Sequence, residues 1–97
     1  MGGAGMSRAA ATELAGEVLG WLAGRPEDLA DFLVASGARP EDLRAAVRQP
    51  EFLGFVLDYL LASEAMLLDC TADLGVPPDR PAAARAALPG GDLPHWT

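Results

Sequence analysis

Apolar side chains recur at helical spacing from the eighth residue onward. The first such stretch places four large apolar residues on one face: Leu14, Val18, Trp21 and Leu22. Because this spacing is typical of an amphipathic helix, the pattern predicts a helix over residues 8–23. Ser7 precedes it as the expected N-cap. The glycine-rich residues 1–6 show no such period, and we expect them to form a disordered tail.

Prolines followed by acidic residues mark the starts of the next helices. Proline has no N–H to lose at the first helical position, and the acidic side chains face the positive end of the helix dipole. Three such starts occur in the sequence, Pro26-Glu27, Pro40-Glu41 and Pro50-Glu51, and Pro78-Asp79 is a weaker copy. Glycines stand where preceding helices should end: Gly24, Gly37 and Gly75. The sequence therefore predicts helices near residues 26–36, 40–48, 50–74 and 80–88.

The predicted helix over residues 50–74 is the most apolar of the set. Its large apolar residues wrap most of its circumference: Phe52, Phe55, Val56, Tyr59, Leu60, Leu61, Leu67 and Leu68. Such a helix is expected to be surrounded by others. Asp58, Glu64 and Asp69 interrupt it, so we do not expect it to span a membrane. We predict an all-α fold, a small bundle of four to five helices around this long central helix, with residues 7–97 in one domain.

Two stretches of the sequence resemble a known family. One is Ser-Gly-Ala-Arg-Pro-Glu-Asp-Leu-Arg at residues 36–44, followed by Pro-Glu-Phe-Leu at 50–53 and the Leu-rich helix. The other is the ending Ala-Leu-Pro-Gly-Gly-Asp-Leu-Pro-His-Trp-Thr at residues 87–97. Over roughly residues 10–97 the chain is similar to domain-of-unknown-function family 3572, small proteins of alphaproteobacteria. The resemblance implies a small helical bacterial protein, and it brings no activity, cofactor or catalytic residue with it.

The charge balance argues against several classes of partner. The chain carries 14 acidic and 7 basic residues, for a formal net charge of -7. Nucleic acids and anionic membrane surfaces require a basic face, and the sequence shows no cluster of arginines. A charged protein partner is therefore expected to be basic. Cys70 is the single cysteine, so no internal disulfide forms, and no targeting segment is visible, which together predict a cytoplasmic protein.

No catalytic arrangement stands out. Cys70 and His95 could form a nucleophile and its base, but nothing in the sequence places them together and no third group orients them. Cys70 falls near Leu67 and Leu74 in the long helix, where a buried, inert thiol is the usual outcome. Ser63 is expected in the middle of that helix, without the strained turn that activates a serine. We predict no catalytic residue and no cofactor.

Carboxylates on the long helix raise the question of a metal. Asp69 and Asp73 are one helical turn apart and could share a hard cation weakly. Transition-metal ligands and a calcium-binding loop are missing, so we predict no metal site. We expect the acidic side chains of this helix to be solvated or paired with preceding arginines: Arg39, Arg44 and Arg48.

Gly16 and Gly20 interrupt the first predicted helix, where each costs roughly 1 kcal/mol relative to alanine. Close approach of a neighbouring helix would explain both, and so would chance in a glycine-rich chain. A homodimer through this glycine face is one hypothesis for the assembly of the protein.

Trp96 and His95 are the candidates for partner binding. Either Trp96 docks onto the helical bundle and closes its core, or it is displayed to a partner. Docking is favoured, because burying an aromatic ring stabilises a fold by a few kcal/mol.

The leading functional hypothesis is a non-catalytic protein-interaction module, an adaptor or small regulatory subunit that binds through an apolar patch with an acidic rim. It follows from the absence of recognisable chemistry. The alternative is a small enzyme or ligand-binding protein with a pocket near Cys70, Tyr59 and the C-terminal tail. An exposed apolar patch would favour the module, and a pocket with convergent polar groups would favour the alternative.

Overall fold

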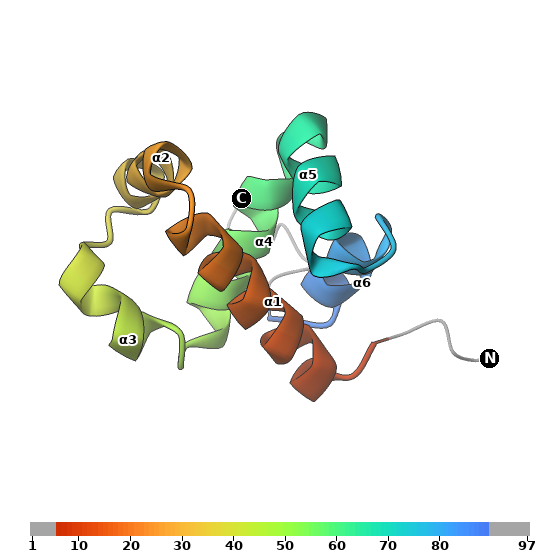
Figure 1. Cartoon of the computed structure of the whole chain (residues 1–97). Coiled ribbons are helices and arrows are strands. Elements are labelled where there is room, and N and C mark those ends of the chain that lie inside the picture. Colours follow the sequence, from red (N-terminus) through yellow and green to blue (C-terminus); the bar gives the residue numbers. More distant parts are fainter. Residues whose placement is uncertain (1–5, 90–97) are drawn as a thin grey trace.

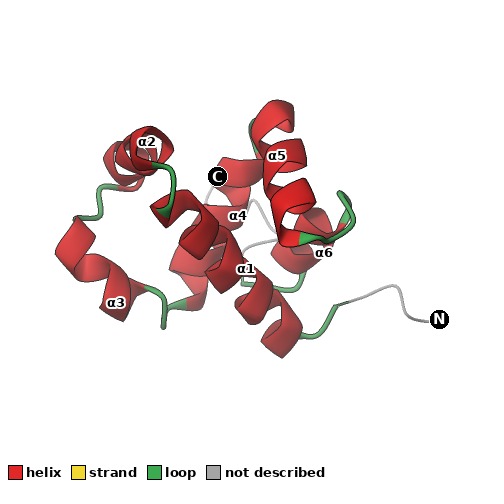
Figure 2. Ribbon diagram, viewed as in Figure 1, coloured by secondary structure: helices red, strands yellow, loops and turns green. Residues whose placement is uncertain are grey.

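A computed structural model of the chain describes residues 6–89 of the 97. These residues form helices joined by short turns, and no strand occurs among them (Figure 2). The elements in chain order are α1 (Arg8–Ala23), α2 (Pro26–Ser36), the 3-10 turn η1 (Pro40–Asp42), α3 (Leu43–Ala46), α4 (Pro50–Leu61), α5 (Glu64–Leu74) and α6 (Arg80–Ala86) (Figure 1). The predicted all-α fold is confirmed. Within residues 6–89, no helix has the length and apolar character needed to cross a bilayer.

The helix ends follow the local chemistry of the sequence. The Ser7 side chain caps α1 by accepting a hydrogen bond from the backbone N–H of Ala10, at 3.0 Å. Gly37 and Gly75 end α2 and α5 in the left-handed region, with φ of 76° and 73°. A side chain would strain the backbone there, which is why glycine ends these two helices.

The first two helices have the predicted bounds, residues 8–23 and 26–36. The helix expected near residues 40–48 is instead the short turn η1 followed by α3. Of the six N-terminal residues expected to form a disordered tail, Met6 alone lies in the described part, and it is partly buried against the core.

The long helix predicted over residues 50–74 is wrong, because the chain breaks at Ala62 and Ser63 into α4 and α5. The backbone of Ser63 is extended, with φ of -130° and ψ of 113°, and its side chain accepts a hydrogen bond from the N–H of Met66 at 3.2 Å. Ser63 is therefore the N-cap of α5 and not a mid-helix residue. Serine favours such caps because its hydroxyl satisfies an N–H that would otherwise lack a partner. The break lets α5 turn away from α4 and pack against α1.

The core forms where α1 crosses in front of α4 (Figure 1). Helix α1 packs against α2, α4, α5 and α6, so it is as central as the predicted 50–74 segment. One face of α1 is buried: Ala11, Leu14, Ala15, Val18, Leu19 and Leu22. The buried residues of α4 meet it: Leu53, Val56, Leu57 and Leu60. Helix α5 adds the buried residues Cys70 and Thr71, and α6 adds Pro81 and Ala84.

Of the two explanations left open for Gly16 and Gly20, the close approach of a neighbouring helix does not occur in the described part of the chain. Both residues are exposed on α1, and no atom lies within 4 Å of the position that a Cβ would occupy on either. The glycine that does permit a close approach is Gly54 in α4, where a Cβ would lie 2.9 Å from Nη1 of Arg85. The absence of a side chain at Gly54 thus makes room for the guanidinium of Arg85.

Arg85 of α6 occupies that space and binds α4. Its Nε donates a hydrogen bond to Oδ1 of Asp58 at 2.7 Å, and its Nη1 donates to the carbonyl oxygen of Pro89 at 3.2 Å. The side chain is only 16% exposed. Charge-assisted hydrogen bonds of this kind are stronger than neutral ones, so this residue holds the last helix and the chain that follows it.

Aromatic rings connect α2 to α4. Phe32 of α2 is fully buried, and its ring centroid lies 5.8 Å from that of Phe52, 5.7 Å from Phe55 and 5.3 Å from Tyr59. Two of the three pairs are edge-to-face, the arrangement that the ring quadrupoles favour. The three rings of α4 are each partly buried. Their contacts with Phe32 anchor α2 to the bundle.

Candidate functional site

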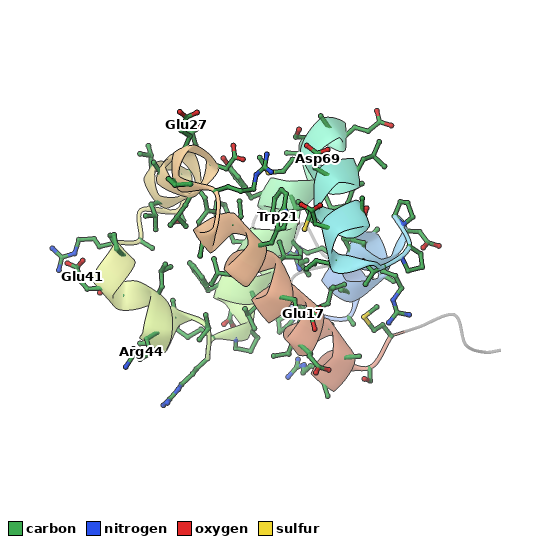
Figure 3. All side chains as sticks on the ribbon, viewed as in Figure 1. Glu17, Trp21, Glu27, Glu41, Arg44 and Asp69 are labelled. Atoms are coloured by element: carbon green, nitrogen blue, oxygen red, sulfur yellow. The ribbon has the colours of Figure 1, made fainter. Side chains whose placement is uncertain are left out.

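A polar cluster forms where the end of α1, the start of α2 and the side of α5 come together. Trp21 lies in the last turn of α1, partly buried, and its Nε1 donates a hydrogen bond to Oδ2 of Asp73 at 2.8 Å. In Figure 3 the indole lies between α1 and α5, with Asp69 above it on α5. This bond joins residues 52 positions apart in the chain, and it depends on the turn at Ser63 that directs α5 back over α1.

Arg25 follows α1 directly and stacks on the same indole. Its guanidinium carbon lies 4.4 Å from the centroid of the Trp21 ring, a distance that gives a cation–π attraction. Its Nε donates to Oδ2 of Asp28 at 2.6 Å. The hydrogen bond with Asp28 raises the pKa of Arg25, and the negative charges of Asp28, Asp69 and Asp73 add to that rise. The guanidinium therefore binds one carboxylate, that of Asp28, and its charge interacts with those of two more on α5.

Tyr59 of α4 and a hollow at the start of α2 extend this cluster. Burial raises the pKa of Tyr59, and the negative charges of Asp31 and Asp28 on α2 raise it further. At the start of α2 lies a hollow of about 450 Å³, lined by Arg25, Pro26, Glu27 and Asp28. We call Asp28, Asp31, Asp69 and Asp73 the acidic rim. Asp73 binds Trp21, Asp28 binds the arginine stacked on that ring, and Asp31 and Asp69 are exposed on the same two helices.

The acidic rim carries more negative charge than its single arginine can balance. In the described part of the chain, Asp31, Asp69 and Asp73 have no arginine nitrogen within 4.0 Å. We expected these acids to be solvated or paired with preceding arginines. Asp69 and Asp73 are exposed, and neither pairs with Arg39, Arg44 or Arg48 in the described part of the chain. Arg39 pairs within its own turn with Glu41 and Asp42, while Arg44 in α3 and Arg48 after it are exposed.

Cys70 lies below this cluster, on the inner side of α5. It is fully buried, and burial raises the pKa of its thiol to about 11, with the charge of Asp73 raising it further and that of Arg25 opposing the rise. At neutral pH the thiol is protonated, so it is a poor nucleophile. Its proposed base, His95, lies outside the described residues, as does Trp96.

The sequence-based alternative placed a pocket near Cys70 and Tyr59. Tyr59 packs on Phe32 of α2, and Cys70 is buried in the hydrophobic core against which Tyr59 also packs. The hollow at the start of α2 is lined by neither of them.

Asp69 and Asp73 are both exposed, and Asp73 accepts the bond from Trp21. Over residues 6–89, no three His, Cys, Asp or Glu side chains are grouped closely enough to hold a metal ion.

Trp21 and Arg25 were not singled out by the sequence as site residues. Trp21 falls on the apolar face of α1, which conceals the role of its indole N–H. One signal was available: an arginine four residues after a tryptophan, across a helix-ending glycine, can stack on the ring. The acids that complete the cluster come from α5, whose position depends on a helix break that the apolar pattern does not show.

The chain belongs to the family described as "Protein of unknown function (DUF3572)", which matches residues 8–91. No curated protein and no solved structure matches the chain. The match covers all of the helices described above, so the cluster around Trp21 lies within the family's domain.

Proposed function

We propose that this member of the DUF3572 family is a non-catalytic protein-interaction module, an adaptor or small regulatory subunit, whose acidic rim binds a basic segment of another protein. One observation supports the proposal above the others: Asp31, Asp69 and Asp73, which no arginine pairs in the described part of the chain, lie exposed on α2 and α5, and Asp73 binds the partly exposed ring of Trp21. Aromatic side chains are enriched at protein interfaces, and charged rims there select the partner and speed its approach. The formal net charge of -7 agrees with a basic partner.

The proposed surface has both parts that such an interface needs. Trp21 supplies an aromatic platform whose orientation is fixed by the bond to Asp73. Leu68, on the outer side of α5, adds an exposed apolar side chain, with 46% of its surface accessible. An apolar surface next to carboxylates fits an amphipathic segment that carries arginine or lysine. The sequence-based candidates Trp96 and His95 lie outside the described residues, and the proposal does not depend on them.

A site-specific cross-linking experiment in the native host tests this surface. A photoreactive residue replaces Ala72 on the exposed side of α5, or Ala45 on the exposed side of α3 as the control. We expect a defined partner to be captured from position 72 and not from position 45. Equal capture from both positions would contradict the proposed surface.

Charge-neutralising variants then test the chemistry with the purified partner. We expect Asp31→Asn with Asp69→Asn to weaken binding roughly tenfold, because two rim ion pairs contribute about 0.7 kcal/mol each. The control variant, Glu41→Gln with Asp79→Asn, changes the net charge equally but lies away from the rim, and it should bind like the wild type. Added salt should weaken wild-type binding more than binding of the rim variant. If the two variants bind alike, the acidic rim is not the binding surface.

A further inference from the structure

Arg25 covers the ring of Trp21 with a guanidinium that is only partly bound by the fold. Its guanidinium carbon lies 4.4 Å from the ring centroid, and its Nε donates to Asp28 at 2.6 Å. Within residues 6–89, its two terminal nitrogens, Nη1 and Nη2, donate no hydrogen bond to the protein. The side chain is 41% exposed. Most of the N–H donors of this arginine therefore have no partner in that part of the chain.

The side chain of Arg25 can leave the ring without a change in the backbone. The N–H of Arg25 donates to the carbonyl oxygen of Leu22 at 2.9 Å, and its carbonyl oxygen accepts from the N–H of Leu29 at 2.8 Å, so the main chain is fixed. One ion pair and one stacking contact hold the side chain, and exposed contacts of both kinds are weak. A competing cation therefore displaces only weak contacts.

The place that Arg25 covers is otherwise preorganised for a cation. The indole is fixed by the hydrogen bond from its Nε1 to Asp73 at 2.8 Å, and Asp69 lies one turn earlier on α5. Besides the hydrogen bond with Asp28, the charges of these two aspartates raise the pKa of Arg25, so a cation on the ring interacts with both. Asp69 is exposed, and no arginine nitrogen of the described chain lies within 4.0 Å of it. The ring and these carboxylates remain in place when Arg25 moves away.

We propose that Arg25 occupies the place on the Trp21 ring that an arginine side chain of the partner takes in the complex. This inference rests on the proposed function, because it names the group of the basic segment that the site binds. Arginine fits the place better than lysine, since a planar guanidinium stacks on an indole with its flat side while its edge donates to carboxylates. On binding, the side chain of Arg25 moves off the ring into solvent.

Nuclear Overhauser contacts test this displacement in the full chain. The probe is a short acetylated peptide amide in which two arginines alternate with alanines. The free protein should show contacts between the side-chain protons of Arg25 and the indole protons of Trp21. At saturating peptide these contacts should disappear, and contacts from a peptide arginine to the indole should replace them. Contacts between Arg25 and the indole that persist in the saturated complex overturn the inference.

Removal of the competing side chain should strengthen binding of the same peptide. Arg25→Ala should bind it about threefold more tightly than the wild type, because no stacked cation has to be displaced. The shift of the Trp21 Nε1–H resonance during titration measures the affinity. Arg44→Ala changes the net charge equally on α3 and should bind like the wild type. A peptide with lysines in place of arginines should gain less from Arg25→Ala. An affinity for the arginine peptide that is unchanged or lower in Arg25→Ala overturns the inference, and so does a lack of binding to both proteins.

The variants of the acidic rim separate this inference from the proposed function. If Asp31→Asn with Asp69→Asn binds the arginine peptide as well as Glu41→Gln with Asp79→Asn does, the rim is not the binding surface and both proposals fail. If the rim variant binds more weakly while Arg25 stays on the ring in the complex, the inference about Arg25 alone fails.

Discussion

Arg85 and Arg25 each bind an aspartate, but their surroundings differ in almost every respect. Arg85 reaches Asp58 across 27 positions of sequence, lies over Gly54, and leaves 16% of its side chain exposed. Arg25 reaches Asp28 only three positions away, and 41% of its side chain is exposed. The first pair joins two helices in a space that only glycine leaves open, whereas the second closes a local turn.

The contrast separates a structural arginine from one in a candidate binding surface. Both paired donors of Arg85 bind parts of the fold. Nε binds Asp58 of α4, and Nη1 binds the carbonyl oxygen of Pro89. Arg25 instead stacks on a partly exposed ring, amid more carboxylates than it can neutralise. An exposed ion pair contributes little to stability, because water screens it and two side chains lose freedom to form it. Its remaining role is to set the charge and shape of the surface around Trp21.

The largest expected effect comes from removing the structural arginine. Arg85→Ala should lower the free energy of unfolding by about 2 kcal/mol, since it removes two charge-assisted hydrogen bonds and leaves the space over Gly54 empty. Urea unfolding measures the loss. Arg80→Ala removes an exposed arginine that begins the same helix and serves as the control. Equal effects of the two variants would contradict the structural role of Arg85.

The stability of the protein at alkaline pH tests whether the Cys70 thiol of α5 is buried. Burial raises the pKa of its thiol from 9.0 to about 11. Between these values the thiol ionises in the unfolded chain and not in the folded one, so stability falls as the pH rises. The free energy of unfolding should drop by about 1.5 kcal/mol between pH 9 and pH 10.5, relative to a Cys70→Ala variant in which this thiol is absent. Parallel pH curves for the two proteins would show that Cys70 is not buried.

Glycine substitutions should have opposite signs in the two helices. Gly54→Ala places a methyl group 2.9 Å from Nη1 of Arg85, whose hydrogen bonds prevent it from moving freely, so we expect a loss of about 1 kcal/mol. Gly20→Ala meets no atom within 4 Å in the middle of α1, and the better helix propensity of alanine should stabilise the protein by about 0.7 kcal/mol. Thermal unfolding distinguishes the signs. A stabilising Gly54→Ala would mean that Arg85 does not occupy that space.

Local chemistry in the sequence was sufficient to predict the starts of α1, α2 and α4 and the all-α class. Ser7, the prolines and the helix-ending glycines act within one turn of themselves, so their effect does not depend on the rest of the fold. The break at Ser63 was missed because apolar residues continue on both sides of it, which the periodic pattern reads as one helix. Its signal was the serine itself, followed by Glu64 in the position of a first-turn acid.

The candidate site could not be predicted for a related reason. Trp21 and Asp73 meet only because α5 turns back at Ser63, so one missed boundary conceals the whole cluster. Gly54 shows the same limit within the fold. A glycine inside a helix lowers the stability of that helix when the helix is considered alone. At Gly54 the position of Arg85 explains why no side chain is present. Contacts between distant segments decide both cases.

The smallest expected effect on stability belongs to Arg25, and it is the sharpest test of the comparison. Arg25→Ala removes an exposed ion pair and a surface stacking contact, so its urea midpoint should fall by less than half of the loss seen for Arg85→Ala. Arg44→Ala changes the net charge equally at an exposed position of α3, and the two midpoints should be close. Arg25→Ala should nevertheless alter the fluorescence of the protein, since the cation stacked on Trp21 is gone, whereas Arg44→Ala should leave it unchanged. A loss of stability as large as that of Arg85→Ala would show that both arginines are structural. The acidic rim would then be a part of the fold, and its carboxylates would have a role other than partner binding.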